Sequence, residues 1–337
     1  MTKHNSADAR LPTSASAKLT VDEARAGLSA LLTRTLTKAP EPILGMTEHL
    51  AAFRGKGVRA LLLFYAAMDE SGLVPSDALT VAAAAELFHL ATLVHDDVID
   101  DALLRRGAET IQAKYGKKQA VICGDYLLCA ATALIAPLHE SYKGAAPFLT
   151  TFTSALSSVC LGELNQLHNN RNLDLTISGY LRIVSGKTAA LFYACAYAGA
   201  LVAGQAKPEA MRLARFGRYI GMVFQVIDDC KDYEQNETQA QKTVLKDIEE
   251  GVVTLPLIFA IASNPEVRTA ALSVFSDRMQ IDRLAALVRG TTGVAQSKAL
   301  AERYVKKAEA LLIGFPDCQT RPLLGLLHKS LNSANAY

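Results

Sequence analysis

The feature that most constrains the fold is an apolar repeat of helical period that runs along nearly the whole chain. From Val21 onward, alanine- and leucine-rich segments place apolar residues at positions i, i+3 and i+4, the spacing of one face of an α-helix. Glycine and proline residues divide this pattern into roughly ten or more helices. Residues 120–123, 223–227 and 252–258 have a strand-like composition but are too short to build a sheet. The sequence therefore predicts an all-α fold.

The connections between these segments contain no long linker, although 337 residues would be enough for two domains of about 150 residues each. We therefore expect residues 21–337 to form one domain. Residues 1–20 are polar and lack the apolar segment of a signal peptide or an anchor, so we expect a disordered tail. The only membrane-like run, residues 189–204, is shorter than the ~20 residues that span a bilayer, and we expect a buried helix there.

Amino-acid composition limits which partners the protein can bind and indicates the cellular compartment in which it works. Half of the residues are hydrophobic, which excludes a globally disordered chain. Lysine and arginine number 35 against 33 aspartate and glutamate residues, so no net field would attract nucleic acid or a membrane surface. The six cysteines form no CxxC pair, which indicates reduced thiols and a cytoplasmic location.

A first cluster of carboxylates follows the apolar run at residues 82–94. Asp96 and Asp100 are i, i+4 neighbours on a helix, and so are Asp97 and Asp101. Like charges at this spacing repel, and a divalent cation would relieve the repulsion; oxygen ligands favour a hard cation such as Mg²⁺. A solvated acidic helix end explains the cluster equally well when it is taken alone.

A second cluster repeats the pattern after the apolar stretch 221–227. Asp228 and Asp232 form another i, i+4 pair, and Asp229 lies between them. A single DDxxD motif is a weak signal, whereas two of them, each ending an apolar helix, are much stronger. The simplest arrangement has two helices facing each other across a deep apolar cavity, with both acidic pairs at its mouth. Cations held there need a polyanion to bridge them, and a diphosphate fits.

Cationic residues occur close to both clusters. The arginine pair at residues 105 and 106 follows the first cluster, and lysines lie on either side of the second. Arginine binds diphosphate oxygens through two parallel hydrogen bonds, whereas lysine acts as a point charge. A basic helix end capped by Gly107 is the alternative for the arginine pair. Residues 185–188 look like the end of a nucleotide-binding P-loop, but Leu181 stands where that motif needs glycine.

Taken together, these motifs resemble the trans-isoprenyl diphosphate synthase (polyprenyl synthetase) family, and most closely its medium- and long-chain members. The resemblance extends from about residue 45 to near the C-terminus. It rests on these stretches: Gly55–Arg59, Glu86–Val94 with the first aspartate motif after it, Arg105–Gly107, Gly124–Leu127, Gly162–Gln166, Lys187–Thr188, Phe224–Ile227 with the second motif after it, Lys242–Asp247 and Gly251–Pro256.

The resemblance implies an isoprenoid synthase fold and a role for each matching residue. The Mg²⁺ ligands would be Asp96, Asp100, Asp228 and Asp232, supported by Asp97 and Asp229, with about three ions per site. The allylic diphosphate would be held by Arg105, Lys187, Thr188, Gln225 and Lys242. Isopentenyl diphosphate would be held by Lys56, Arg59, His89 and Arg106. For His89, a satisfied buried histidine is the interpretation that its sequence context alone favours.

The reaction implied by the resemblance is chain elongation. Mg²⁺ and the cationic side chains stabilise the leaving diphosphate while an allylic cation forms, and the double bond of isopentenyl diphosphate attacks that cation. A proton is then lost, and the chain has grown by five carbons. An apolar pocket must exclude water, because water would quench the cation. Gly57, Ala60 and Val252 depart from the residues usual in the family, which are a basic residue, proline and lysine respectively.

Product length is predicted from the helix that precedes Asp96. Short-chain relatives close their pocket with aromatic residues at the positions of Ala91 and Thr92, which are small here. Phe88, one turn deeper, is a candidate floor, and Phe148 or Phe152 on another helix is an alternative. We expect an all-trans product of about C30 to C40, as in a respiratory quinone side chain, with a C20–C25 synthase as an alternative.

Other functions and partners remain open at this point. One alternative is a chain that needs a second subunit, as some medium-chain members do, and its two intact aspartate motifs then make it the catalytic one. A terpene synthase would lack the second DDxxD motif and the isopentenyl diphosphate site. A homodimer is expected from the family alone. We expect no stable membrane anchor, although release of a long apolar product makes transient membrane contact plausible.

Overall fold

The structure is a computed structural model that describes residues 17–52, 55, 57–138, 142, 148–234, 246–276 and 281–332. These residues form 16 helices and only four two-residue strands, so the all-α prediction is confirmed. They group into two compact units. Unit 1 comprises Met1–Ser154, Ala194–Ala214 and Gly314–Leu323, and unit 2 comprises Ala155–Tyr193, Arg215–Ile313 and Leu324–Tyr337. The expectation of one domain over residues 21–337 stays a prediction.

The helices of unit 1 come mainly from the first half of the chain. They are α1 (Val21–Thr37), α2 (Glu41–Ala52), α3 (Val58–Ala66), α4 (Asp77–Ile99), α5 (Ile111–Tyr115) and α6 (Lys117–Ile135). Unit 2 contains α9 (Ile177–Lys187), α12 (Lys246–Glu250), α13 (Leu255–Ser263), α14 (Pro265–Ser276), α15 (Ile281–Arg289) and α16 (Gly293–Leu311). Four of the boundaries between the units fall within α8 (Phe148–Asn169), α10 (Ala189–Val202), α11 (Lys207–Glu234) and α17 (Asp317–Asn332), and the fifth lies between α16 and α17.

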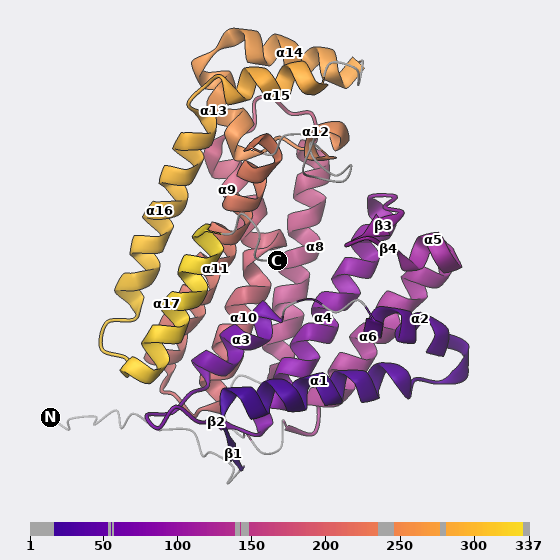
Figure 1. The fold of residues 1–337 in the computed structure, drawn as a ribbon, viewed down its shortest axis with the longest axis vertical. Helices are drawn as coiled ribbons and strands as arrows, with labels where there is room; N and C mark the ends of the chain where they lie inside the picture. Colours follow the sequence, from indigo (N-terminus) through magenta and orange to yellow (C-terminus); the bar gives the residue numbers. More distant parts are fainter. Residues whose placement is uncertain are drawn as a thin grey trace, which may run out of the picture. The chain divides into compact units, whose positions relative to one another are not determined.

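Helix α4 is the central element of unit 1. Alanines 82–85 are completely buried, and their small side chains and high helix propensity let neighbouring helices approach on several sides. Figure 1 shows α6 beside α4, and α1 and α3 also pack against α4. In unit 2, Leu257, Val267 and Leu284 belong to one apolar core that joins α13, α14 and α15. Figure 1 shows α14 and α15 side by side.

The strands occur where the sequence did not predict them. Residues 120–123 and 223–227 are helical, and 255–258 begin α13, so the three strand candidates were wrong. Instead, β1 (Lys18–Leu19) pairs with β2 (Val74–Pro75), and β3 (Leu104–Arg105) pairs with β4 (Ala108–Glu109), both antiparallel. The expected disordered tail is therefore wrong for β1, because backbone pairing with β2 orders it. Residues 1–16 lie outside the described residues.

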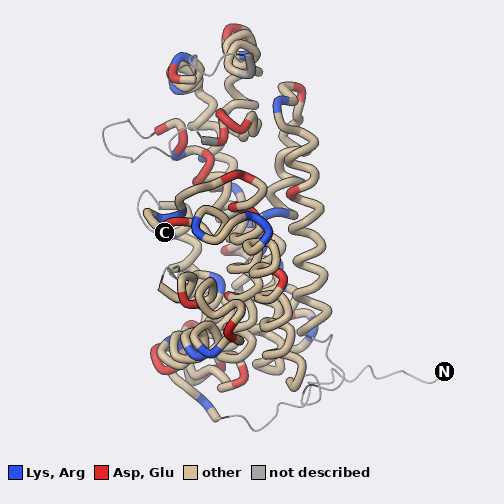
Figure 2. The backbone as a smooth tube through the Cα atoms, turned by 90° about the vertical axis from the view of Figure 1, so that its right-hand side faces the viewer, with Lys and Arg blue, Asp and Glu red and all other residues tan. Residues whose placement is uncertain are grey.

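Two described helices match a membrane span in length and composition, and neither is the run at residues 189–204 that the sequence singled out. The 14-residue helix α10 is too short, as expected, but α4 and α6 are long and apolar enough. A core helix of a globular protein has the same properties, and more than half of the apolar window of α4 is buried. Figure 2 shows acidic and basic residues interspersed along the chain between long uncharged stretches.

Candidate functional site

The first aspartate motif lies at the C-terminal end of α4. The Asp100 N–H donates to the Asp96 carbonyl at 2.8 Å, and the Ala102 N–H donates to the Asp97 carbonyl at 2.9 Å. The second bond and the left-handed conformation of Asp101 (φ 50°) form a Schellman ending of the helix. Asp96 and Asp100 therefore remain neighbours one helical turn apart, as the sequence predicted. The predicted helical pairing of Asp97 with Asp101 is wrong, because the backbone reverses at Asp101, whose carboxylate pairs with Lys117.

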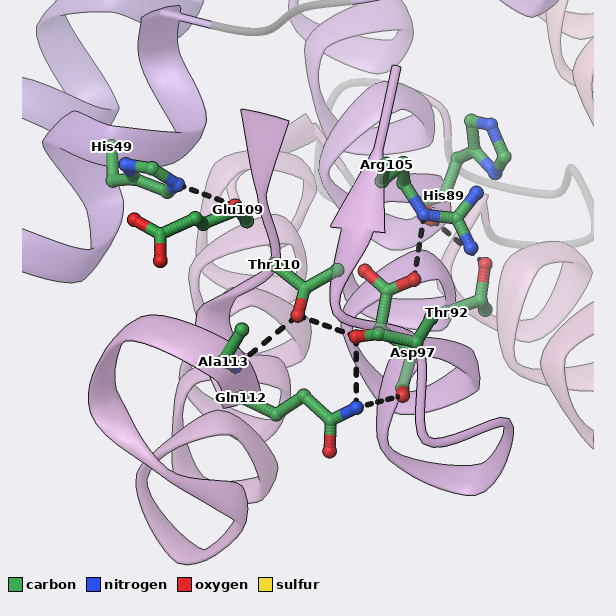
Figure 3. Close-up of polar contacts among 10 residues, drawn as sticks. His49, His89, Thr92, Asp97, Arg105, Glu109, Thr110, Gln112 and Ala113 are labelled. Atoms are coloured by element: carbon green, nitrogen blue, oxygen red, sulfur yellow. Dashed lines mark hydrogen bonds and ion pairs between the residues drawn. The ribbon is translucent and has the colours of Figure 1, made fainter. Parts of the chain in front are cut away.

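The arginine pair lies on a hairpin and not on a helix end. Arg106 and Gly107 connect β3 to β4, and both have positive φ (52° and 81°), as a two-residue type I′ turn requires. The alternative of a glycine-capped helix is therefore wrong. The hairpin brings the Arg105 Nε to 2.7 Å from the Asp97 Oδ1 (Figure 3). Asp97 is buried and oriented by this charge-assisted hydrogen bond.

Two residues that the sequence did not single out hold the end of α4 against the hairpin. The Gln112 Nε2 donates to the Asp97 carbonyl at 2.7 Å and to the Ala102 carbonyl at 2.9 Å. The Thr110 hydroxyl donates to the same Ala102 carbonyl at 2.7 Å and accepts the N–H of Ala113, which caps α5 (Figure 3). These bonds satisfy carbonyls that a helix end leaves without helical partners.

The residues predicted to bind isopentenyl diphosphate are partly brought together in unit 1. The Arg59 NH1 lies 3.0 Å from the His89 Nε2. Because a guanidinium can only donate, the Nε2 accepts and His89 is neutral. Burial and the nearby arginines lower the pKa of His89 well below its usual value. Arg106 lies against Gly55, since a Cβ on Gly55 would come within 2.7 Å of its guanidinium. Lys56 lies outside the described residues.

Two of the three departures from the family pattern have a structural explanation. Gly57 precedes α3 with φ 64°, a conformation that a lysine or arginine would adopt only with strain. The Ala60 N–H donates to the Glu86 Oε1 at 3.1 Å, a bond that proline could not make. Glu86 thereby satisfies a first-turn N–H of α3, and this carboxylate on α4 was not predicted. Val252 donates its N–H to the Asp247 carbonyl.

The chain-length residues occupy the middle of α4. Ala91 and Phe88 are buried, and the Thr92 hydroxyl donates to the His89 carbonyl at 2.8 Å. The Phe88 ring stacks on the Phe152 ring of α8, with 5.4 Å between centroids. Phe152 and Phe148 were the two alternatives to Phe88 as the residue that closes the pocket. Phe152 contacts Phe88, whereas Phe148 packs edge-to-face on Tyr142.

In unit 2 a chain of hydrogen bonds connects three predicted residues. The Thr188 hydroxyl donates to the Gln225 Oε1 at 2.8 Å, and the Gln225 Nε2 donates to the Asp229 Oδ1 at 2.8 Å. The Tyr180 hydroxyl donates to the other oxygen, Oδ2, at 2.5 Å. Asp229 is buried, and these two donors favour its charged form.

Lys187 is held at the C-terminal end of α9. Its Nζ lies 2.6 Å from the Glu163 Oε2 on α8. The two helices touch at Gly162, where a Cβ would come within 2.2 Å of the Lys187 backbone nitrogen. Only glycine permits this approach, so the Gly162–Glu163 pair sets the place of the Lys187 side chain. Lys242 lies outside the described residues, as does the side chain of Lys246.

A fourth carboxylate joins the second aspartate motif. Asp247 at the start of α12 shares a side-chain hydrogen bond with Asp232, which requires a proton between them. Burial and the charge of Asp247 raise the pKa of Asp229 and of Asp232 to about 8. Burial and the neighbouring carboxylates raise the pKa of Asp247 to about 6. Asp228 is half exposed and 3.0 Å from Lys231.

This donor set fits a hard divalent cation. All the ligands are carboxylate oxygens, and a cation would replace the proton that Asp232 and Asp247 share. Over the described part of the chain, no three acidic, histidine or cysteine side chains are grouped closely enough to hold a metal ion by themselves. Mg²⁺ commonly combines one or two carboxylates with substrate phosphates and water.

Replacing Asp232 by asparagine is expected to stabilise the metal-free protein at pH 8. A carboxyl whose pKa rises from 3.8 to about 8 on folding contributes stability below pH 3.8 that is lost as the pH rises through 8. We expect the melting temperature of Asp232→Asn to exceed that of the wild type by about 2 °C or more at pH 8, and the difference to shrink as the pH falls and to vanish below the unfolded pKa of 3.8. Thermal unfolding in EDTA measures it, with the surface variant Glu302→Gln as control. An unchanged melting temperature at pH 8 would contradict the prediction.

The two aspartate motifs lie in different units, and the expectation that they share one cavity stays a prediction. The roles of the site residues remain predictions as well. Sequence reasoning missed six polar residues: Glu86, Thr110, Gln112, Glu163, Tyr180 and Asp247. Three of them, Glu86, Glu163 and Asp247, lie within stretches that carried the resemblance, which was a usable signal. Nothing in the sequence pointed to Thr110, Gln112 or Tyr180, because their partners are not neighbours along the chain.

Comparison with known proteins decides the family. The sequence model of the polyprenyl synthetase family matches residues 40–289. The chain belongs to this family. A heptaprenyl diphosphate synthase component 2 from Geobacillus stearothermophilus is 35% identical over 87% of this chain and 90% of its own. An octaprenyl diphosphate synthase from Escherichia coli is 32% identical over 90% of this chain and 94% of its own.

A solved polyprenyl synthase agrees with the sequence comparison. The Caulobacter crescentus enzyme, in complex with calcium and isoprenyl diphosphate, superposes with a TM-score of 0.83 at 30% identity. The match covers 92% of this chain and 95% of the other. This polyprenyl synthetase has the isoprenoid synthase fold and is a prenyltransferase, as the sequence predicted.

Proposed function

We propose that this chain is an all-trans polyprenyl diphosphate synthase that condenses isopentenyl diphosphate with an allylic diphosphate to a product of about C30 to C40. The observation that carries the proposal is the presence of both aspartate motifs with cationic partners on ordered elements. Arg105 is paired to the first motif at 2.7 Å. Lys187 is held by Glu163, and its charge acts on Asp247, the carboxylate that joins the second motif. The hepta- and octaprenyl relatives support the product class.

Lys187, Thr188, Gln225 and Arg105 bind the diphosphate of the allylic substrate, and Lys242 completes the set. In this proposal they donate hydrogen bonds to the diphosphate oxygens, on which negative charge grows as the carbon–oxygen bond breaks. Arg59, Arg106 and His89, with Lys56, bind isopentenyl diphosphate and direct its double bond at the allylic cation. Because His89 is neutral, the positive charges of that site among the described residues are those of Arg59 and Arg106.

Asp96, Asp100, Asp228 and Asp232 would hold the divalent cation, which we propose is Mg²⁺ with about three ions per site. When bound, it would supply positive charge to neutralise the leaving diphosphate. Asp97 and Asp229 orient the motifs through Arg105 and through Tyr180 with Gln225. The calcium bound by the Caulobacter relative supports a hard divalent cation.

The stacked pair Phe88–Phe152 closes the product pocket. Ala91 and Thr92, nearer to the first motif on α4, leave room for chains beyond C15, because their side chains are small. A product of this length fits the side chain of a respiratory quinone. All six cysteines are free thiols, which supports the proposed cytoplasmic location.

A second candidate is the catalytic subunit of a two-chain synthase, which the name of the Geobacillus relative, component 2, favours.

Exposed apolar side chains support association with another copy or another chain. Val121 and Ile122 lie on α6, and Leu161, Leu164 and Leu167 lie on α8. We propose a homodimer built on these faces, and sedimentation of the purified chain tests it.

Incubation of the purified chain with Mg²⁺, labelled isopentenyl diphosphate and C10, C15 or C20 allylic diphosphates tests the function. Chromatography of the dephosphorylated products is expected to show a ladder that ends near C30–C40. A ladder that ends at C20–C25 would indicate the shorter-chain enzyme. No incorporation from any primer would favour the two-chain enzyme. A hydrocarbon formed without isopentenyl diphosphate would indicate a terpene synthase and contradict elongation.

A further inference from the structure

Tyr180 is a buried residue that contacts the second aspartate motif. It lies on α9, is 4% exposed, and its hydroxyl donates to the Asp229 Oδ2 at 2.5 Å. Burial and the adjacent aspartate raise the pKa of Tyr180 well above 10, so the phenol keeps its proton and acts as a donor. Tyr180 therefore holds a carboxylate of the second motif from the side opposite to Gln225.

The bond from Tyr180 determines the orientation of two further side chains. With the Asp229 Oδ2 occupied by the phenol, the Oδ1 faces the Gln225 Nε2 at 2.8 Å. Gln225 thus donates its NH₂ to Asp229 and accepts the Thr188 hydroxyl at its Oε1. If the phenol were removed, the Asp229 carboxyl group would lose one of its two donors and could rotate, and the Gln225 side chain that donates to it would no longer be held in place.

The position of the network along the helices makes this orientation relevant to the site. Thr188 is the C-cap of α9, eight residues after Tyr180, while Gln225 and Asp229 are one turn apart on α11. Lys187, which immediately precedes Thr188, is fixed separately by Glu163. The Tyr180 network thus controls the two neutral ligands of the proposed allylic diphosphate site, and the Glu163 contact controls one of its charged ligands, Lys187.

We propose that Tyr180 is a positioning residue for the allylic diphosphate and acts through Asp229 on Gln225 and Thr188. The inference rests on the proposed function, because Gln225 and Thr188 are assigned to that substrate there. Tyr180 touches no substrate itself. Its effect is therefore specific to one of the two substrates and depends on Gln225.

Tyr180→Phe removes only the donor oxygen. We expect its KM for farnesyl diphosphate to rise roughly tenfold, the loss of about one hydrogen bond to a charged group, while the KM for isopentenyl diphosphate changes less than twofold. The dissociation constant of labelled farnesyl diphosphate, measured by equilibrium dialysis without isopentenyl diphosphate, should rise by the same factor. This binding readout needs no turnover.

Tyr233→Phe is the matched control. Tyr233 is 1% exposed and its hydroxyl lies 3.2 Å from the Thr254 Oγ1, so the substitution also removes one buried hydrogen bond in unit 2. It should leave the KM values of both substrates within twofold of the wild type. Equal effects of Tyr180→Phe and Tyr233→Phe on farnesyl diphosphate would overturn the inference.

A double-mutant cycle tests the route of the effect. In a Gln225→Ala background the orientation of residue 225 no longer matters, so adding Tyr180→Phe should change the KM for farnesyl diphosphate less than twofold. Full additivity of the two effects would show a structural role alone and overturn the proposal. If the wild type elongates no primer, the proposed function fails; if it elongates and Tyr180→Phe binds farnesyl diphosphate normally, only this inference fails.

Discussion

Replacing Asp228 by asparagine is expected to lower kcat/KM for chain elongation by about 10³ or more. Asparagine keeps the shape of the side chain and removes the negative charge that would hold a divalent cation at the second motif. Losing a group that stabilises charge on a leaving diphosphate costs several kcal/mol in the transition state. Because the Asp228 side chain is 51% exposed, the substitution leaves the core unchanged, and the melting temperature should stay close to that of the wild type.

Asp174→Asn is the matched control for this experiment. Asp174 is also an exposed aspartate of unit 2 and pairs with Arg268 at 2.9 Å, as Asp228 pairs with Lys231 at 3.0 Å. Exposed ion pairs contribute little to stability, so Asp174→Asn should keep full activity. Initial rates at several Mg²⁺ concentrations measure both variants. A kcat/KM of Asp228→Asn within tenfold of the wild type would exclude Asp228 as a cation ligand.

Replacing Phe88 by alanine is expected to lengthen the product by at least one isoprene unit. Phe88 lies three residues before Ala91 on α4, about 4.5 Å deeper at 1.5 Å per residue, and its ring is stacked on Phe152. Truncation removes one ring of this pair and opens space for a longer growing chain. The same change should destabilise the fold by about 3–5 kcal/mol, as for other buried phenylalanines.

Two further variants separate the pocket from general core damage. Phe152→Ala should also lengthen the product, because it removes the other ring of the stack. Phe216→Ala removes an equally buried ring in unit 2, and it should cost similar stability without changing product length. Chromatography of the dephosphorylated products at a temperature where all variants are folded makes the comparison. A Phe88→Ala ladder that ends at the wild-type length would show that Phe88 is a core residue and not the floor.

Local patterns were sufficient for the fold class and for the nature of the chemistry. The helical period of apolar residues predicted an all-α chain, because a helix buries one face at a spacing that is visible in the sequence itself. The i, i+4 carboxylates of each motif could be read in the same way, and the structure keeps Asp96 and Asp100 at the end of α4. Only the Asp97–Asp101 pair failed, since a Schellman ending reverses the chain at Asp101.

The residues that orient the motifs were decided by tertiary structure. Arg105 reaches Asp97 because the chain turns at Arg106–Gly107, and no apolar period signals a two-residue hairpin on the surface of a helical protein. Tyr180 and Asp229 are 49 positions apart, and Phe88 and Phe152 are also far apart along the chain. Such contacts depend on which helices pack together, whereas the sequence pattern reports only which face of each helix is buried.

The sequence by itself determined that this chain is helical, that it carries two carboxylate motifs suited to a hard cation and a diphosphate, and that it resembles the family to which it belongs. The tertiary structure decided which donors bind Asp97 and Asp229, which aromatic ring stacks on Phe88, and which carboxylate accepts the Ala60 N–H. The physical reason is that hydrophobic periodicity and local charge repulsion act over one or two helical turns, while hydrogen bonds between helices exist only after those helices have packed.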